Sequence, residues 1–434
     1  MYRYAIENLK KWKNKKDKKP LIIRGARQVG KTWIMKEFGK NNYSNIAYIN
    51  FDGNEKMKNL FELDYDIKRI ISGLEIETEE EIDSNNTLII FDEVQEVPKA
   101  LTSLKYFYEN HPEYNIVAAG SLLGVALHEG TSFPVGKVEF LDLYPMTFNE
   151  FLIATNNEKY NNLLQTKDFN SINPFKDNII ELLKIYYIVG GMPEVVLNYS
   201  NNKNFLETRN IQNRILKAYE QDFSKHAPNN IVPRIRMLWN SIPSQLSKDN
   251  KKFIYGLIKD GARAKEYELA LSWLIDCGLI YKINRVNKTN IPLKHYEDIS
   301  AFKLFILDVG LLCAKSEIDP KSVLEKQDIF VEFKGACTEE FVVTQLISKD
   351  EFTLYYFSSD NSKSEVDFII NYEGFVIPIE VKASENLQSK SLKNFIIKEK
   401  TKIAVRTSLS NYYKQDILIN IPLYMINNLT DLIK

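Results

Sequence analysis

Short apolar runs recur between residues 20 and 151, and helical segments separate them. Four of these runs are apolar on both faces: Leu21–Gly25, Ile46–Phe51, Leu88–Glu93 and Asn115–Ser121. Strands that helices bury on both faces have this composition. The pattern therefore predicts an α/β fold, with a parallel sheet between two layers of helices.

The middle of the chain has a helical pattern with polar, Asn-rich breaks. Met237–Leu246 and Phe253–Ile258 are predicted as short helices, and Ala264–Cys277 as an amphipathic helix. Gly278 ends this last helix, and a strand follows it. Three helices and a strand, accompanied by basic residues, predict a winged helix-turn-helix.

Composition excludes some classes of protein and leaves others open. The 434 residues include 57 basic and 57 acidic side chains, so any surface that attracts nucleic acid must be local. None of the three cysteines forms a CxxC pair, which argues against a zinc site and favours a reducing cytoplasm. No stretch approaches about 18 uncharged apolar residues, so we expect a cytoplasmic protein with no membrane span.

The first apolar run leads into a glycine-rich loop with the Walker A pattern. The loop consists of Gly25, Ala26, Arg27, Gln28, Val29, Gly30, Lys31 and Thr32. A strand before the loop and a helix after it form the context that this motif requires. Backbone N–H groups of such a loop, with the helix N-terminus, bind phosphates. We expect Lys31 to contact the β- and γ-phosphates and Thr32 to bind Mg²⁺.

Two acidic residues end the third run. Asp92 is placed to hold the water shell of Mg²⁺, and Glu93 to act as general base toward the attacking water. The fourth run is expected to form an additional strand between the two Walker strands of the P-loop sheet, and Ser121 at its end is predicted to face the γ-phosphate as a sensor. A capping role before a helix at Leu122–His128 is its alternative.

Several longer segments carry a resemblance to a known family. GARQVGKT, FDEVQ, AAGSLLGVALHEGTSFPVGKVEFLDLYPMTFNEF and YYIVGGMPEVV are similar to prokaryotic AAA-type ATPases with a C-terminal domain of unknown function. In the wider group of signal-transduction ATPases, a Gly-x-Pro element contacts adenine. The resemblance places Gly191 and Pro193 in that role, with a simple helix–turn–helix bend as the alternative. The family commonly has Gly-Arg at Gly136-Lys137, so no arginine finger is named.

The predicted winged helix offers four basic residues to DNA: Arg263, Lys265, Lys282 and Arg285. Glu266 and Glu268 on the same helix would face phosphates poorly. Many winged helices contact only protein, so a structural role stays open.

Acids and one lysine near the C-terminus have the spacing of the PD-(D/E)xK nuclease core. Glu380 and Lys382 point to one face of a strand, beside Asp367 on a neighbouring strand. A helical glutamate lies above them, and the family's pattern favours Glu339 over Glu340. The carboxylates would hold Mg²⁺ and the lysine would position water. A chance match and a fold that only binds are the alternatives.

Together these patterns predict four segments. We expect a P-loop core at 1–155, a helical lid at 156–204, a winged helix at 205–305 and a restriction-endonuclease-like α/β domain at 306–434. Two functions stay open. The first is an ATP-driven, Mg²⁺-dependent machine that acts on DNA. The second is an ATP-dependent switch or scaffold with an inert C-terminal domain, bound to a protein partner or to itself.

Overall fold

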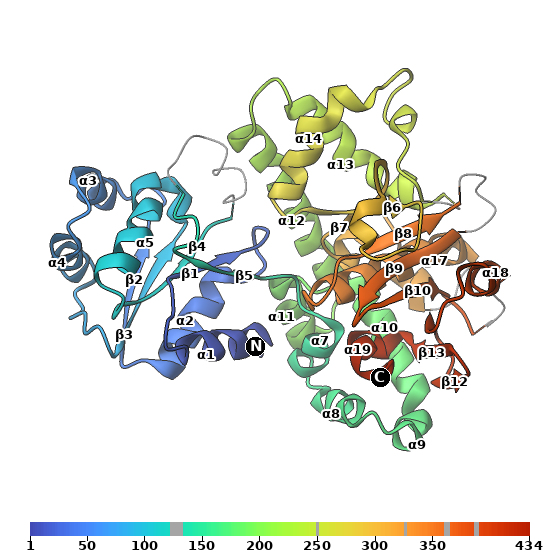
Figure 1. Ribbon diagram of the computed structural model, residues 1–434. Helices are drawn as coiled ribbons and strands as arrows, with labels where there is room; N and C mark the ends of the chain where they lie inside the picture. The colour runs from blue at the N-terminus through green and yellow to red at the C-terminus, as the bar shows by residue number, and fades with distance from the viewer. Residues whose placement is uncertain (122–132, 249–250, 325–327, 360–364, 386–389) are drawn as a thin grey trace. The chain divides into compact units, whose positions relative to one another are not determined.

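The computed structural model describes residues 1–121, 133–248, 251–324, 328–359, 365–385 and 390–434 (Figure 1). These residues form two compact units. The N-terminal unit comprises Tyr2–Tyr144 and Asp276–Gly278, and the C-terminal unit comprises the remainder. No helix in the described ranges is long and apolar enough to span a membrane. The helix predicted at Leu122–His128 lies outside the described residues.

A five-stranded parallel sheet forms the N-terminal unit. Its order is β2-β3-β4-β1-β5, with β1 (Leu21–Arg24), β2 (Asn45–Asn50), β3 (Thr87–Asp92), β4 (Asn115–Ala119) and β5 (Glu139–Asp142). Strand β4 lies between β1 and β3, which confirms the predicted additional strand between the two Walker strands. Every residue of β3 is buried, as its continuous apolar run requires.

Each helix of this unit buries apolar side chains. The helices are α1 (Ala5–Lys13), α2 (Lys31–Asn42), α3 (Glu55–Leu63), α4 (Ile67–Thr78) and α5 (Pro98–Asn110), with a short η1 (Val94–Glu96). Phe61 of α3, Ile70 of α4 and Leu104 of α5 pack with Phe91 of β3. Each such side chain contributes about 1.5–3 kcal/mol when fully buried.

Helices dominate the first half of the C-terminal unit. They are α7 (Phe148–Ala154), α8 (Glu158–Thr166), α9 (Phe169–Ile172), η2 (Asn173–Phe175), α10 (Lys176–Val189), α11 (Pro193–Asn202), α12 (Phe205–His226), α13 (Val232–Leu246), η3 (Tyr255–Leu257) and α14 (Ala264–Asp276). The prediction of a helix at Phe253–Ile258 was wrong, since only the short 3₁₀ helix η3 forms there. Instead, the Phe253 N–H donates to the Phe302 carbonyl (2.8 Å), and the Ile254 N–H donates to the Gln245 side chain (3.0 Å).

The second half of this unit contains an eight-stranded mixed sheet of order β12-β13-β11-β10-β9-β8-β6-β7. The strands are β6 (Ile280–Val286), β7 (Glu297–Ile306), β8 (Tyr355–Ser358), β9 (Glu365–Tyr372), β10 (Phe375–Val381), β11 (Ala404–Ser408), β12 (Tyr413–Gln415) and β13 (Leu418–Pro422). Its helices are η4 (Leu293–Tyr296), α15 (Val309–Lys315), α16 (Pro320–Leu324), α17 (Asp328–Ile347), α18 (Lys390–Glu399), η5 (Leu423–Asn428) and α19 (Leu429–Leu432).

This sheet continues across residue 305, where a domain boundary was predicted. Strand β6 pairs with β8 in parallel, with Val286 opposite Phe357. The two side chains belong to one apolar cluster that also includes Val366 and Phe395, and burying that cluster joins the predicted wing to the C-terminal strands. Elements α17, β8, β9, β10, α18 and β11 follow in the order helix, three strands, helix, strand.

A buried carboxylate holds the turn between α10 and α11. Asp308 accepts hydrogen bonds from the backbone N–H groups of Gly191 (2.6 Å) and Leu311 (2.9 Å). A Cβ atom on Gly191 would lie 2.1 Å from the Met146 carbonyl oxygen, so only glycine fits there. Burial raises the pKa of Asp308 from 3.8 to about 6, although these hydrogen bonds oppose the shift.

Asp308 should make stability depend on pH. Between pH 3.8 and about 6 the folded state holds the Asp308 proton more tightly than the unfolded state, so stability falls as pH rises. Asp308→Asn cannot titrate, and its free energy of unfolding should fall less than that of the wild type from pH 4 to 6. The difference is about 1.4 kcal/mol per unit of pKa shift. Urea unfolding at several pH values measures it.

The control is Asp416→Asn, because Asp416 is exposed in a turn with φ of 50°, a conformation that asparagine tolerates. It should leave the slope of stability against pH unchanged. Equal slopes for the wild type and Asp308→Asn would contradict the raised pKa.

Candidate functional site

The glycine-rich loop follows β1 directly and curls over the N-terminus of α2. Gly25 has a φ of 147°, and a Cβ atom there would lie 2.2 Å from the Leu143 carbonyl oxygen. A side chain at residue 25 would therefore displace the loop. This close approach explains physically why the first position of the motif must be glycine.

Lys31 is the first residue of α2 and is almost completely buried. Its ammonium group donates to the carbonyl oxygens of Gly25 (2.9 Å) and Ala26 (2.8 Å). Burial lowers the pKa of Lys31 to about 8, although the charges of Glu93 and Asp92 oppose this shift. An anion that met this ammonium would restore its ordinary pKa, so the loop favours negatively charged ligands.

Thr32 and Asp92 bring two oxygen atoms together from α2 and β3. The Thr32 hydroxyl donates to the Asp92 carboxylate at 2.6 Å, and the Tyr48 hydroxyl donates to the same oxygen at 3.0 Å. A hydroxyl beside a carboxylate is a donor set that suits Mg²⁺, so these residues fit that ion. Tyr48 was missed by the sequence analysis. Its only signal was a polar-tipped side chain on the strand beside Asp92.

Three hydrogen bonds restrain Glu93. Its carboxylate accepts from the Gln95 amide (2.8 Å) and from the hydroxyl (3.0 Å) and backbone N–H (3.3 Å) of Ser121. Burial raises the pKa of Glu93. The Gln95 hydrogen bond, the charge of Lys31 and the Ser121 hydrogen bonds outweigh that effect and leave the pKa below its ordinary value. Glu93 is thus ionised, and its oxygens are already engaged.

Family comparisons agree with this geometry. A model described as an AAA domain matches residues 17–152. The N-terminal segment is an AAA-type P-loop ATPase domain. Two domains of unknown function follow: DUF8612 matches residues 180–322 and DUF4143 matches residues 334–426. A search of curated proteins found no significant match.

Comparison with solved structures gives weak similarities over most of the chain. The Walker-type ATPase of Pyrococcus abyssi is 15% identical, with 71% of this chain and 94% of that chain covered and a TM-score of 0.44. The ORC1 protein of Aeropyrum pernix, in complex with DNA, is 11% identical (72% and 90% covered, TM-score 0.28). Cdc6p from Pyrobaculum aerophilum is 10% identical (74% and 93% covered, TM-score 0.26).

Gly191 and Pro193 belong to the C-terminal unit, whereas the glycine-rich loop belongs to the N-terminal unit. The Gly191 N–H donates to Asp308, and its carbonyl accepts from the Met146 N–H at 2.7 Å. Pro193 begins α11, where its missing N–H is tolerated. These contacts account for both residues structurally, and an adenine contact stays a prediction.

The four basic residues predicted to meet DNA have different surroundings. Arg263 and Lys265 are exposed near the start of α14. Arg285 pairs with Asp298 at 2.7 Å, and the Lys282 ammonium lies 4.5 Å from the centre of the Phe302 ring. Intramolecular contacts therefore occupy two of the four, and contact with DNA stays a prediction.

Three C-terminal acids, Glu339, Asp367 and Glu380, form one acidic cluster, and basic partners neutralise it. Glu380 pairs with Lys382 at 2.8 Å, and the Asp367 carboxylate accepts from the Val381 N–H at 2.7 Å. Glu339 forms ion pairs with Lys251 and, at 3.8 Å, with Lys303. Glu340 instead accepts from the Ile306 N–H (3.2 Å), so Glu339 is the helical acid of this acidic cluster.

Lys303 is the residue that the sequence analysis missed here. It is 1% exposed and lies 3.0 Å from Glu365 as well as near Glu339. Its signal was a single lysine within the apolar run of β7. Burial and the charges of Glu339 and Glu380 raise the pKa of Asp367, which favours its neutral form.

A metal ion at the acidic cluster would have to displace these partners. Among the described residues, no group of three or more His, Cys, Asp or Glu side chains is arranged to hold a metal ion. The lysine ammonium groups already supply the positive charge that a divalent ion would bring. The described residues therefore do not fit Mg²⁺ at this cluster.

Tyr48 should support metal binding through Asp92. Tyr48→Phe keeps the ring, which packs beneath the Lys36 ammonium at 3.4 Å, and removes only the hydrogen bond to Asp92. The Mg²⁺ concentration that half-saturates nucleotide binding should rise roughly fivefold, about 1 kcal/mol. A Mg²⁺ titration with a fluorescent ATP analogue measures this.

Tyr43→Phe is the matched control, because the Tyr43 hydroxyl meets only Asn115, at 3.4 Å, in the same unit. It should leave the Mg²⁺ dependence unchanged. If both variants behaved alike, the Tyr48–Asp92 contact would have no part in metal binding.

Proposed function

We propose that this chain binds ATP with Mg²⁺ and hydrolyses it at the P-loop site of the AAA domain. One observation carries the proposal. The ammonium of Lys31, the Thr32–Asp92 pair and Glu93 converge where β1 and β3 end. Ligands of α/β sheets bind at the carboxyl ends of parallel strands.

Each residue has a defined task in this proposal. The loop amides and Lys31 bind and orient the phosphates, and Thr32 and Asp92 hold Mg²⁺. The ion, when bound, neutralises charge that develops on the phosphate oxygens. Glu93 accepts a proton from the attacking water as it approaches the γ-phosphorus. ADP and inorganic phosphate leave, and the proton passes from Glu93 to solvent.

The hydrogen bonds on Glu93 supply a resting state for this ATPase. With Gln95 and Ser121 as donors, its carboxylate has little capacity left to accept a proton from water. Hydrolysis therefore requires Ser121 or Gln95 to release it. Ser121 lies at the tip of β4, so a γ-phosphate that attracted its hydroxyl would free Glu93. This supports the predicted sensor role.

The neutralised acidic cluster favours an ATP-dependent switch over a metal-dependent nuclease as the role of the whole chain. Glu339 pairs with Lys251, Glu380 pairs with Lys382, and Lys303 pairs with the neighbouring Glu365. In this second proposal the nuclease-like element order persists without metal chemistry, and the C-terminal unit binds a partner. Duplex DNA that stimulated ATP turnover would indicate that Arg263 and Lys265 contact DNA.

Glu93→Gln should separate binding from hydrolysis. The amide preserves the size of the side chain but cannot accept the proton, so turnover should fall by about 10²–10³-fold while ATP affinity stays within a few-fold. Phosphate release gives the turnover, and calorimetry gives the affinity. Lys31→Ala, the companion variant, should lose ATP affinity itself. Normal turnover by Glu93→Gln would reject Glu93 as the base.

The acidic cluster should bind no divalent ion at millimolar concentration. Asp92→Asn removes the AAA domain's metal carboxylate, so this variant should bind no Mn²⁺, as measured by the electron paramagnetic resonance signal of free Mn²⁺. The wild type should not nick plasmid DNA in the presence of Mg²⁺, so Lys382→Ala should cause no loss of such an activity. One Mn²⁺ bound per Asp92→Asn chain, and lost on adding Glu380→Gln, would overturn this assignment.

A further inference from the structure

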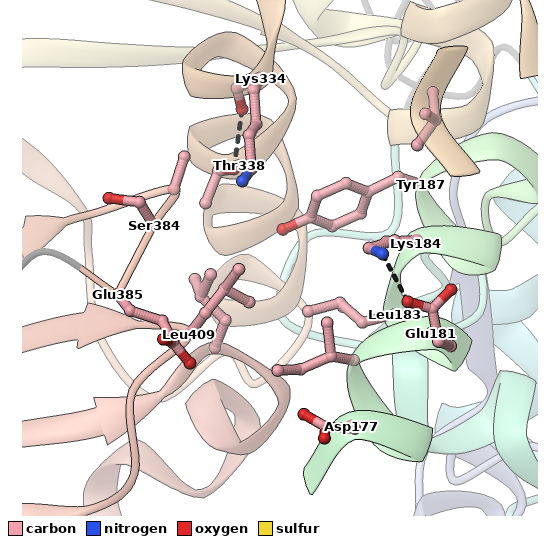
Figure 2. Close-up of a pocket in the computed structure, with 14 residues that line it drawn as sticks. Asp177, Glu181, Leu183, Lys184, Tyr187, Lys334, Thr338, Ser384, Glu385 and Leu409 are labelled. Carbon is pink, nitrogen blue, oxygen red and sulfur yellow. Dashed lines mark hydrogen bonds and ion pairs between the residues drawn. The ribbon is translucent and has the colours of Figure 1, made fainter. Parts of the chain in front are cut away.

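The C-terminal unit contains a cavity of about 630 Å³ that the ATPase proposal does not use (Figure 2). Helix α10 forms one wall, α17 a second, and the residues after β10 and β11 a third. Strands β10 and β11 are parallel, so this wall lies at their carboxyl ends. That edge is where α/β sheets bind ligands, and pockets of about 300–1,000 Å³ hold small molecules.

Aliphatic side chains contribute much of the lining. Leu183 comes from α10, Val323 from α16, and Leu409 and Leu423 from segments that follow β11 and β13. They offer surface to the flat face of a ring and no hydrogen bonds. A purely polar ligand, such as a free sugar, would leave its hydroxyl groups unpaired against them.

One buried hydroxyl has no partner in this cavity. Tyr187 is 4% exposed, and the Thr338 side chain lies near its hydroxyl, but no hydrogen bond of good geometry joins that hydroxyl to a described residue. Figure 2 shows it directed from α10 into the cavity, toward the side of Thr338 and Ser384. The Thr338 hydroxyl donates instead to the Lys334 carbonyl at 2.7 Å. A buried unpaired hydroxyl costs about 1–3 kcal/mol, so a ligand with a polar edge would gain by meeting it.

Charges around the cavity select against polyanions. Glu181 pairs with Lys184 at 2.5 Å, and Glu385 pairs with Lys176. Asp177 adds a third acid to the lining. The lining thus contains three acids against two lysines, Lys184 and Lys334, so a triphosphate would find no net positive charge there. The favoured ligand is therefore uncharged, with flat apolar faces and a hydrogen-bonding edge.

The cavity also adjoins the acidic cluster through the chain itself. Thr338 immediately precedes Glu339, and Ala383 immediately follows Lys382. The cavity lining therefore neighbours the acidic cluster along the chain, while Lys382 itself pairs with Glu380 at 2.8 Å and is not part of the lining.

We propose that this cavity binds an unpaired nucleoside, with the edge of its base hydrogen-bonded to Tyr187. The nucleoside is either free or one unit of a single strand. A nucleobase combines flat faces with a polar edge and carries no charge. A base within a duplex presents no free pairing edge and cannot enter between α10 and α17. The proposal does not depend on ATP hydrolysis or on a metal ion.

The test uses the full-length protein with its AAA site saturated by Mg²⁺-ADP, so that nucleosides cannot bind there. The probes are the four deoxynucleosides, their 5′-triphosphates, and a five-nucleotide single strand with 2-aminopurine, alone or in duplex. At least one nucleoside should bind about tenfold more tightly than its triphosphate. The single strand should change 2-aminopurine fluorescence, and the duplex should not. Binding of the free nucleoside without the strand would assign the cavity to a small molecule.

Variants locate the binding. Tyr187→Phe should weaken it about fivefold, the loss of one hydrogen bond. Tyr356→Phe is the matched control, because its hydroxyl is also buried without a partner but lies outside the cavity lining. Leu183→Trp should fill the cavity and abolish binding. If this tryptophan prevents folding, Ala383→Leu fills the cavity from another wall and should have the same effect. ATP turnover should stay unchanged in every variant, so it reports folding and keeps the two proposals separate.

Two results would overturn the proposal. One is the absence of binding by every nucleoside and by the single strand. The other is binding that Tyr187→Phe and both filling variants leave intact, which would place the ligand elsewhere. Preference for triphosphates would contradict the charge argument and reject an uncharged ligand.

Discussion

The hydrogen bond from the Thr32 hydroxyl to the Asp92 carboxylate, 2.6 Å long, is the contact on which the AAA domain's site depends. It joins the start of α2 to the end of β3. Helix α2 follows β1, and β4 lies between β1 and β3 in the sheet. Only parallel strands bring both ends to one edge. The buried Lys31 and the restrained Glu93 lie at that same edge, so one topological rule gathers the residues that we propose for phosphate, metal and water.

The two acidic sites of this chain differ in what balances their charge. At the AAA domain, Asp92 accepts hydrogen bonds from the neutral hydroxyls of Thr32 and Tyr48, which leaves its negative charge for a cation. In the C-terminal unit, the ammonium groups of Lys251 and Lys303 meet Glu339 directly. A buried carboxylate needs a counter-charge in either case. Where the protein supplies it from its own lysines, a metal ion has no electrostatic role left.

The cavity beside the second site extends this contrast. Two of its acids, Glu181 and Glu385, pair with lysines, aliphatic side chains contribute much of its lining, and Tyr187 is left to make the specific contact. The uncharged nucleoside that we propose for this cavity would need no metal ion for its recognition.

The order of apolar runs and the Walker motifs determined the α/β class, the inserted strand and the identity of Lys31, Thr32, Asp92 and Glu93, because local spacing alone constrains these residues. Spacing also identified Asp367, Glu380 and Lys382 as neighbours, since strand alternation is local, and the family resemblance added Glu339. Tertiary structure decided the rest. Lys251 and Lys303 meet Glu339 only because β7 joins the C-terminal sheet, and Tyr48 meets Asp92 only because β2 pairs with β3. Long-range pairing of this kind has no local signature, so the sequence could place the acids and Lys382 but not Lys251 and Lys303.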